Sequence, residues 1–178
     1  MNNILVQNKN PMSKLVVAWD LDGTLFDSQH RVKIEDGKFD LDYWIANCTE
    51  EQIHKDKLLP LTDLFKEYSK TGFTQICVTA RVINEHDLSF FKKHGFEFDM
   101  ILHRSTSSEL DQILKSRKLN EYFSQNEMIP FMAFDDKQEN LEVFDKFGFR
   151  TFHAEYMNEK LETGSYQEMK KRPAEFVN

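Results

Sequence analysis

The chain has 178 residues, 40% of them hydrophobic, and a formal net charge of −7. This length favours one core, so we expect a single globular domain over residues 1–178. The negative charge argues against broad, non-specific binding of nucleic acid, which needs an excess of Lys and Arg on one face. No apolar run is long enough for a signal peptide or a membrane span, and we expect a cytoplasmic protein without a membrane partner.

Short apolar strands alternate with amphipathic helices along the chain. The run from Leu15 to Trp19 predicts a first buried strand, and apolar residues at helical spacing predict a helix over residues 60–70. We expect further strands at 73–79, 99–102, 131–134 and 150–153, and helices at 84–94, from Ser107 or Ser108 to about 118, and at 139–147. This alternation predicts an α/β, Rossmann-like fold: a mostly parallel sheet with helices on both faces.

Two segments lie outside this alternation. Residues 26–57 lack clear periodicity, and we interpret them as a flap or small insertion without room for a large cap domain. Residues 157–178 are polar and charged, and they predict a surface helix followed by a loose tail. The core is then expected over residues 14–155 approximately.

Reactive side chains stand at the ends of three predicted strands. Because ligands bind beyond the carboxyl ends of the strands in such sheets, we expect these side chains to converge on one site. They are Asp20 and Asp22 after the first strand, Thr79 and Arg81 after the second, and Asp135 and Asp136 after the fourth.

The sequence DLDGTL at residues 20–25 resembles the first motif, DxDGT[LV], of the haloacid dehalogenase superfamily. Thr79 resembles the hydroxyl residue of the second motif, and Asp135 with Asp136 resembles the acidic fourth motif. For the third motif, a lone lysine, Lys115 is our choice, and Lys118 is its rival. The resemblance covers residues 15–153 apart from the insertion, and it implies a phosphatase of that fold.

The resemblance implies a role for each of four side chains. Asp20 would attack phosphorus and form an aspartyl-phosphate that water then hydrolyses. Asp22 would protonate the leaving oxygen and then activate the water. Lys115 and the Thr79 hydroxyl would bind phosphoryl oxygens and offset the developing charge.

A magnesium ion is the expected cofactor, because a phosphate dianion repels an anionic nucleophile and Mg²⁺ prefers oxygen ligands. Asp20, Asp135 and the backbone carbonyl of Asp22 are the expected ligands. Asp136 would hold a metal-bound water or orient Lys115. A calcium loop of the EF-hand type is unlike this sequence, because that pattern needs Gly at its sixth position and Gly23 is fourth.

The substrate is less closely defined. The segment from Val78 to Arg81 and the acidic motif make the chain similar to the 3′-phosphatase domain of bacteriophage-type polynucleotide kinases, which implies a nucleic-acid 3′-phosphate end reaching an uncovered site. Alternatives are a small-nucleotide phosphatase, acting on 5′- or 3′-nucleoside monophosphates, and a non-catalytic binding protein of the same fold.

Arg81 and two aromatic residues keep two interpretations each. Arg81 contacts the substrate phosphate or forms a surface salt bridge. Trp44 and Tyr43 stack a nucleobase or pack the flap onto the sheet. The sequence leaves the oligomeric state open.

Overall fold

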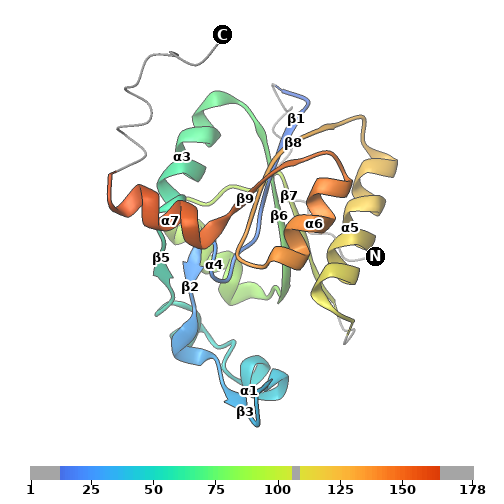
Figure 1. Ribbon diagram of the computed structural model, residues 1–178. Coiled ribbons are helices and arrows are strands. Elements are labelled where there is room, and N and C mark those ends of the chain that lie inside the picture. The colour runs from blue at the N-terminus through green and yellow to red at the C-terminus, as the bar shows by residue number, and fades with distance from the viewer. Residues whose placement is uncertain (1–12, 106–108, 165–178) are drawn as a thin grey trace.

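The computed structural model describes residues 13–105 and 109–164, and its centre is a five-stranded parallel sheet (Figure 1). The strand order is β7-β6-β1-β8-β9, and each neighbouring pair is parallel. The predicted Rossmann-like fold is therefore confirmed. The strands are β1 (Leu15–Trp19), β6 (Thr74–Val82), β7 (Met100–Arg104), β8 (Ile129–Asp135) and β9 (Arg150–His153).

Helices cover both faces of the sheet. Alternate residues of β1 point to opposite sides, so that Val17 and Trp19 belong to one apolar cluster and Val16 and Ala18 to another. The first cluster lies under α3 (Leu61–Thr71), α4 (Glu85–His94) and α7 (Ala154–Glu162). The second lies under α5 (Asp111–Gln125) and α6 (Gln138–Lys146).

Aromatic rings fill much of the first cluster. The ring of Trp19 stacks on Phe134 with centroids 4.4 Å apart and meets the edge of Phe65 at 5.6 Å. Its indole Nε1 donates a hydrogen bond of 3.0 Å to Gln75, which satisfies the one polar atom of a fully buried side chain. This packing makes the end of β1 rigid directly before Asp20.

The insertion begins and ends at a two-stranded antiparallel ribbon formed by β2 (Phe26–Asp27) and β5 (Lys57–Leu58). It projects from the sheet as a small separate lobe (Figure 1). Its short elements are η1 (Gln29–Arg31), β3 (Ile34–Glu35), β4 (Lys38–Phe39), α1 (Leu41–Ala46) and α2 (Glu50–Ile53).

Several predicted bounds were wrong. β7 ends at Arg104 and β8 begins at Ile129, each two residues beyond the predicted bound. β6 continues three residues past Thr79, because Arg81 is buried and Val82 pairs with Arg104 of β7 after a shift in register. α5 continues to Gln125 instead of ending near 118, because Leu119 and Tyr122 extend its buried stripe. α7 begins at Ala154, before the segment in which we expected a surface helix.

α5 begins at Asp111 with Leu110 at its N-cap, so the prediction that Ser107 or Ser108 caps this helix was wrong. Residues 107 and 108 themselves, and residues 165–178 of the predicted tail, lie outside the described residues. Among the helices of the described part, none is both long enough and apolar enough to cross a membrane.

Candidate active site

The loop after β1 carries the first motif and is tightly wound. The Asp20 amide donates to the carbonyl of Phe134, and the Gly23 amide donates to that of Phe26, at 3.0 and 2.8 Å. Gly23 has a φ of +75°, which favours glycine. A Cβ atom on Gly23 would lie 2.7 Å from Oδ2 of Asp136. The loop therefore needs glycine both for its backbone angle and for its close approach to the fourth motif.

Three carboxylates meet at the carboxyl ends of β1 and β8. One oxygen each from Asp20, Asp135 and Asp136 lies within 4.8 Å of the others. Asp135 is held in place by hydrogen bonds from the Lys137 amide at 3.0 Å and from Nδ2 of Asn140 at 2.9 Å. The set offers only oxygen ligands at the spacing of a single ion, and it fits Mg²⁺.

The electrostatics of this carboxylate cluster favour a cation. Burial and the neighbouring charge of Asp135 raise the pKa of Asp136 to about 6. Burial also raises the pKa of Asp20 well above its usual value, and the charge of Lys115 offsets this only in part. Because crowded, buried carboxylates resist ionisation, a cation among them would be bound and would restore the charged form of Asp20.

Lys115 reaches the cluster from α5. Its Nζ donates to Oδ1 of Asp20 at 2.7 Å and to Oδ2 of Asp135 at 2.5 Å, and its side chain is 1% exposed. Burial would lower the pKa of Lys115, but the two carboxylates outweigh it and raise the pKa, so the amine stays charged. Lys118 is buried as well. Of these two lysines, Lys115 lines the cavity described below.

The side chain of Asp22 is not part of the carboxylate cluster. Oδ1 of Asp22 accepts a hydrogen bond of 2.6 Å from Ser28, and the guanidinium of Arg81 binds both oxygens of Asp22. Burial raises the pKa of Asp22, but the charge and hydrogen bonds of Arg81 outweigh it, and the pKa is lowered. The carboxyl group of Asp22 is thus held in one orientation. The role of its backbone carbonyl as a metal ligand stays a prediction.

Arg81 is buried and binds two further carboxylates, those of Asp56 at 3.1 Å and Asp87 at 2.6 Å. Of the two interpretations, ion pairing is what the structure shows, although the pairs are buried and not at the surface. Thr79 is buried, and its Oγ1 accepts a hydrogen bond of 3.1 Å from the Arg81 amide. Both residues line the same cavity as Asp20.

This cavity has a volume of about 440 Å³ and is bordered by the insertion. Trp44 is 7% exposed and packs beneath the guanidinium of Arg31, 4.1 Å from the ring centroid, whereas Tyr43 is 39% exposed. Trp44 thus packs the insertion and also lines the cavity. The apolar residues that the insertion contributes to the lining are Val32, Phe39, Leu41 and Trp44.

A model of the bacteriophage T5 5′-deoxynucleotidase family matches residues 6–177. The chain belongs to this family. The 5′-deoxynucleotidase of Escherichia phage T5 is 26% identical over 177 residues, which cover 86% of this chain and 72% of that protein.

Solved structures show that this 5′-deoxynucleotidase family member has the haloacid dehalogenase fold. A haloacid dehalogenase-like hydrolase, SP0104 from Streptococcus pneumoniae, superimposes with a TM-score of 0.55 at 16% identity, over 85% of this chain and 97% of that one. A chain of the Pnkp1/Rnl/Hen1 RNA repair complex matches with a TM-score of 0.55 at 22% identity, over 78% of this chain but only 42% of that one. Together with the family, this identifies the chain as a phosphatase.

Sequence reasoning missed several residues of the site. Asn140 supports Asp135, and Asp56 and Asp87 bind Arg81. Arg31 is fully buried against Asp56. Asp87 carries one signal, because Asn84 three residues earlier forms a capping box with it. The other three carry no such signal, and their hydrogen bonds in the folded chain reveal the role.

Proposed function

We propose that the chain hydrolyses deoxynucleoside 5′-monophosphates, with Asp20 as the nucleophile and Mg²⁺ as the cofactor. The observation that carries the proposal is that one cavity is lined both by Asp20 with Lys115 and by the apolar side chains of the insertion. The first group suits a phosphate, and the second suits a nucleobase. Membership of the 5′-deoxynucleotidase family supports the same substrate class.

At the phosphate end, the carboxylate of Asp20 attacks phosphorus opposite the departing 5′ oxygen, and an aspartyl-phosphate forms as the P–O bond breaks. Lys115 and Thr79 donate hydrogen bonds to phosphoryl oxygens and hold the group in line. Asp20, Asp135 and Asp136 would hold the Mg²⁺ ion, which supplies positive charge against the repulsion between the phosphate and Asp20.

Asp22 moves the protons. In the first step its carboxyl group gives a proton to the departing 5′ oxygen, and the nucleoside leaves as an alcohol. In the second step the carboxylate of Asp22 takes a proton from the water that attacks the aspartyl-phosphate, and phosphate is released. A bound phosphate dianion beside Asp22 raises the pKa of that carboxyl group, which opposes the effect of Arg81 and favours the protonated form needed first.

At the other end, the nucleobase packs against the insertion. The cavity volume of about 440 Å³ falls within the range of roughly 300–1,000 Å³ usual for small-molecule sites. Phe39 and Leu41 are 48% and 38% exposed while lining the cavity, so each has apolar surface for a ligand to cover. A flat aromatic base would gain from that contact.

A nucleic-acid 3′-phosphate end, the substrate favoured by the sequence resemblance, becomes the second candidate. The likeness to a chain of an RNA repair complex shows the fold alone. The side chains of the insertion border the cavity instead of leaving it uncovered, which favours a small substrate.

The experiment measures phosphate release from deoxynucleoside 5′-monophosphates, their 3′ isomers, ribonucleotides and a 3′-phosphorylated oligonucleotide, with Mg²⁺ and with EDTA. Wild type is compared with Asp20→Asn and with Asp63→Asn, the same change at an exposed position of α3. We expect Mg²⁺-dependent release, fastest from deoxynucleoside 5′-monophosphates, that only Asp20→Asn abolishes. A preference for the oligonucleotide would refute the substrate, and an active Asp20→Asn variant would refute the nucleophile.

A further inference from the structure

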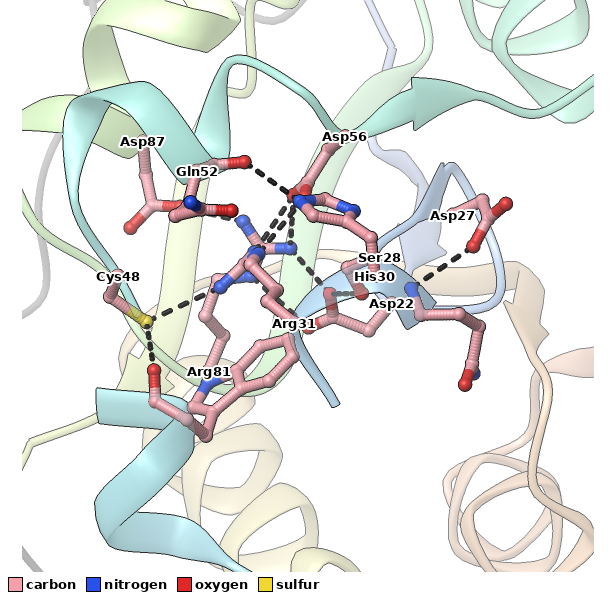
Figure 2. Close-up of polar contacts among 12 residues, drawn as sticks. Asp22, Asp27, Ser28, His30, Arg31, Cys48, Gln52, Asp56, Arg81 and Asp87 are labelled. Atoms are coloured by element: carbon pink, nitrogen blue, oxygen red, sulfur yellow. Dashed lines mark hydrogen bonds and ion pairs between the residues drawn. The ribbon is translucent and has the colours of Figure 1, made fainter. Parts of the chain in front are cut away.

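A buried network of charged side chains connects the insertion to Asp22 (Figure 2). Nη2 of Arg81 donates to Asp22 and, at 3.1 Å, to Oδ2 of Asp56. The same Oδ2 accepts from Nη2 of Arg31 at 2.8 Å, and Oδ1 of Asp56 accepts from Nε of Arg31 at 2.9 Å. Asp56 therefore lies between two guanidinium groups.

The members of the network come from three places in the fold. Arg31 ends η1 near the start of the insertion, and Asp56 directly precedes β5 at its end. Arg81 belongs to β6 of the central sheet. The side chains of Arg31, Asp56 and Arg81 are all 0% exposed, whereas that of Asp22 is 30% exposed and lines the cavity. Arg81 also lines the cavity, but Asp22 is the member of the network most open to substrate.

The geometry leaves Arg81 little freedom. Its Nε and Nη2 bind Asp22, its Nη1 binds Asp87, and its Nη2 is shared with Asp56. Hydrogen bonds to Asp56 and Asp87 fix the plane of the Arg81 guanidinium. That plane in turn sets the orientation of the Asp22 carboxyl group, which Arg81 binds through Nε and Nη2. Asp87 is fixed in turn by accepting a hydrogen bond of 3.0 Å from the Asn84 amide.

Asp56 also binds the guanidinium of Arg31, whose charge lies near Asp22. Arg31 is close enough for its charge to lower the pKa of Asp22, after the larger effects of burial, Arg81 and Ser28. With Asp56 present, both Nε and Nη2 of Arg31 are occupied by Asp56, and its Nη1 lies 3.3 Å from Sγ of Cys48. Without Asp56, Arg31 would be a buried cation without that carboxylate, and Asp22 would be one of the carboxylates left to attract it.

We propose that Asp56 of the insertion is a positioning residue for the reaction, which acts through Arg81 to hold Asp22 in the orientation that serves the leaving oxygen. This inference rests on the proposed function, because it takes Asp22 as the acid and base. It assigns the insertion a second task besides lining the cavity. Arg31 supports the same role, since its two hydrogen bonds hold Asp56 against the start of the insertion.

The choice of leaving group separates positioning from a merely structural effect. The 5′ oxygen of a nucleoside is a poor leaving group and needs the proton of Asp22, whereas the phenolate of an aryl phosphate leaves without one. The measured quantity is kcat/KM, which reports the steps up to transfer of the phosphoryl group to Asp20. A general loss of folded protein would lower kcat/KM for both substrates equally.

The test compares Asp56→Asn with wild type on a deoxynucleoside 5′-monophosphate and on p-nitrophenyl phosphate. We expect kcat/KM for the nucleotide to fall on the order of tenfold through kcat, with KM little changed, which is part of the usual contribution of a general acid, and kcat/KM for the aryl phosphate to change far less. A rise in KM for the nucleotide with kcat unchanged would show a displaced apolar wall instead and would overturn the positioning role. Asp42→Asn, the same change at an exposed position of α1, is the matched control and should leave both values unchanged. Asp22→Asn is the reference for complete loss of the acid.

A second variant keeps the test decisive if Asp56→Asn does not fold. Asp56→Leu combined with Arg31→Met removes both charges of the buried pair, and such replacements are often tolerated. It still lacks the carboxylate that holds Arg81. The same selective loss on the nucleotide is expected, with thermal unfolding measured to show that the variant is folded.

The outcomes distinguish the inference from the function on which it rests. If kcat/KM falls for the nucleotide but not for the aryl phosphate, both in Asp22→Asn and in an Asp56 variant, the proposed function and the positioning role are supported. If kcat/KM falls selectively for the nucleotide in Asp22→Asn but equally for both substrates in the Asp56 variants, the positioning role is overturned. The proposed function is then unaffected. An Asp22→Asn variant that loses both substrates equally overturns the role of Asp22 as the acid, and the inference falls with it.

Discussion

Nζ of Lys115 lies 2.7 Å from Oδ1 of Asp20, although 95 positions separate the two residues in the chain. The amine thus stands beside the proposed nucleophile and, through its second hydrogen bond, beside Asp135. A fixed positive charge at this point offsets the charge of a phosphoryl group as it is transferred.

Replacing this lysine distinguishes it from its neighbour on α5. We expect Lys115→Met to lower kcat/KM on the order of a hundredfold, the usual effect of removing one preorganised charge donor. Lys118→Met should have a far smaller effect, because Lys118 does not line the cavity among the described residues. Steady-state phosphate release from the two purified variants makes the comparison. A larger loss in Lys118→Met would assign the third motif to that residue instead.

Gly23 should matter both for stability and for metal binding. Gly23→Ala places a left-handed alanine in the loop, at a cost of about 1–2 kcal/mol, and its Cβ would displace the carboxylate of Asp136. Gly95→Ala is the matched control, since Gly95 has a φ of +74° and no atom of the described residues lies within 4 Å of the added Cβ. Both variants should lose stability in urea unfolding, Gly23→Ala the more because of its contact with Asp136, and only Gly23→Ala should need more Mg²⁺ for half-maximal activity. Equal Mg²⁺ requirements would show that the approach of Gly23 to Asp136 is unimportant.

The apolar wall of the insertion should affect binding more than turnover. Phe39→Ser and Leu41→Ser remove apolar surface that lines the cavity but is already partly exposed, so the fold should tolerate them. We expect KM for a deoxynucleoside 5′-monophosphate to rise on the order of tenfold, with little change in kcat. Ile45→Ser is the control, because Ile45 is 51% exposed on α1 but does not line the cavity. An unchanged KM in Phe39→Ser and Leu41→Ser would show that the nucleobase does not bind against these two side chains.

The contribution of Asp111 to the stability of the fold should depend on pH. It accepts hydrogen bonds from Lys137 at 2.6 Å and Arg104 at 3.0 Å; burial raises the pKa of Asp111, but these cations outweigh it and lower the pKa. A depressed pKa stabilises the fold above the usual pKa of an aspartate, and this stabilisation is lost as the pH falls through the lowered value. Asp111→Asn should therefore reduce the free energy of unfolding at neutral pH, and the difference from wild type should shrink in acid.

Urea unfolding of wild type and Asp111→Asn at several pH values measures this difference. Asp63→Asn, at an exposed position of α3, should show little difference at any of them. A gap between wild type and Asp111→Asn that widens in acid would contradict the sign of the pKa shift.

The sheet could be predicted well because its signals are local. β1 and β9 have the predicted bounds, since each is a short run that ends at a polar residue or a helix. The meeting of Asp20 with Asp135 follows from topology, because parallel neighbours bring their carboxyl ends together. The end of β6 was missed because Arg81 does not look like a strand residue until its buried carboxylate partners are known.

The insertion could not be predicted in the same way. Its strands have two residues each, and its two helices have six and four, which is too short for hydrophobic periodicity to show. Its two ends are joined by the ribbon of β2 and β5 and by the pair of Arg31 with Asp56. Such a pair of distant, ordinary charges carries no sequence pattern, so its link to Arg81 and Asp22 emerges only from the fold.

In the proposed mechanism, Asp20 carries the phosphoryl group during turnover of a nucleotide. The most direct measurement mixes the enzyme with a deoxynucleoside 5′-monophosphate and Mg²⁺, quenches the mixture in acid within the first turnover, and locates phosphate on the digested peptides by mass spectrometry. We predict phosphate on the carboxylate of Asp20, dependent on Mg²⁺ and absent from Asp20→Asn. Release of phosphate at the normal rate, with no phosphorylated Asp20 at any quench time, would contradict the role of Asp20 as the nucleophile.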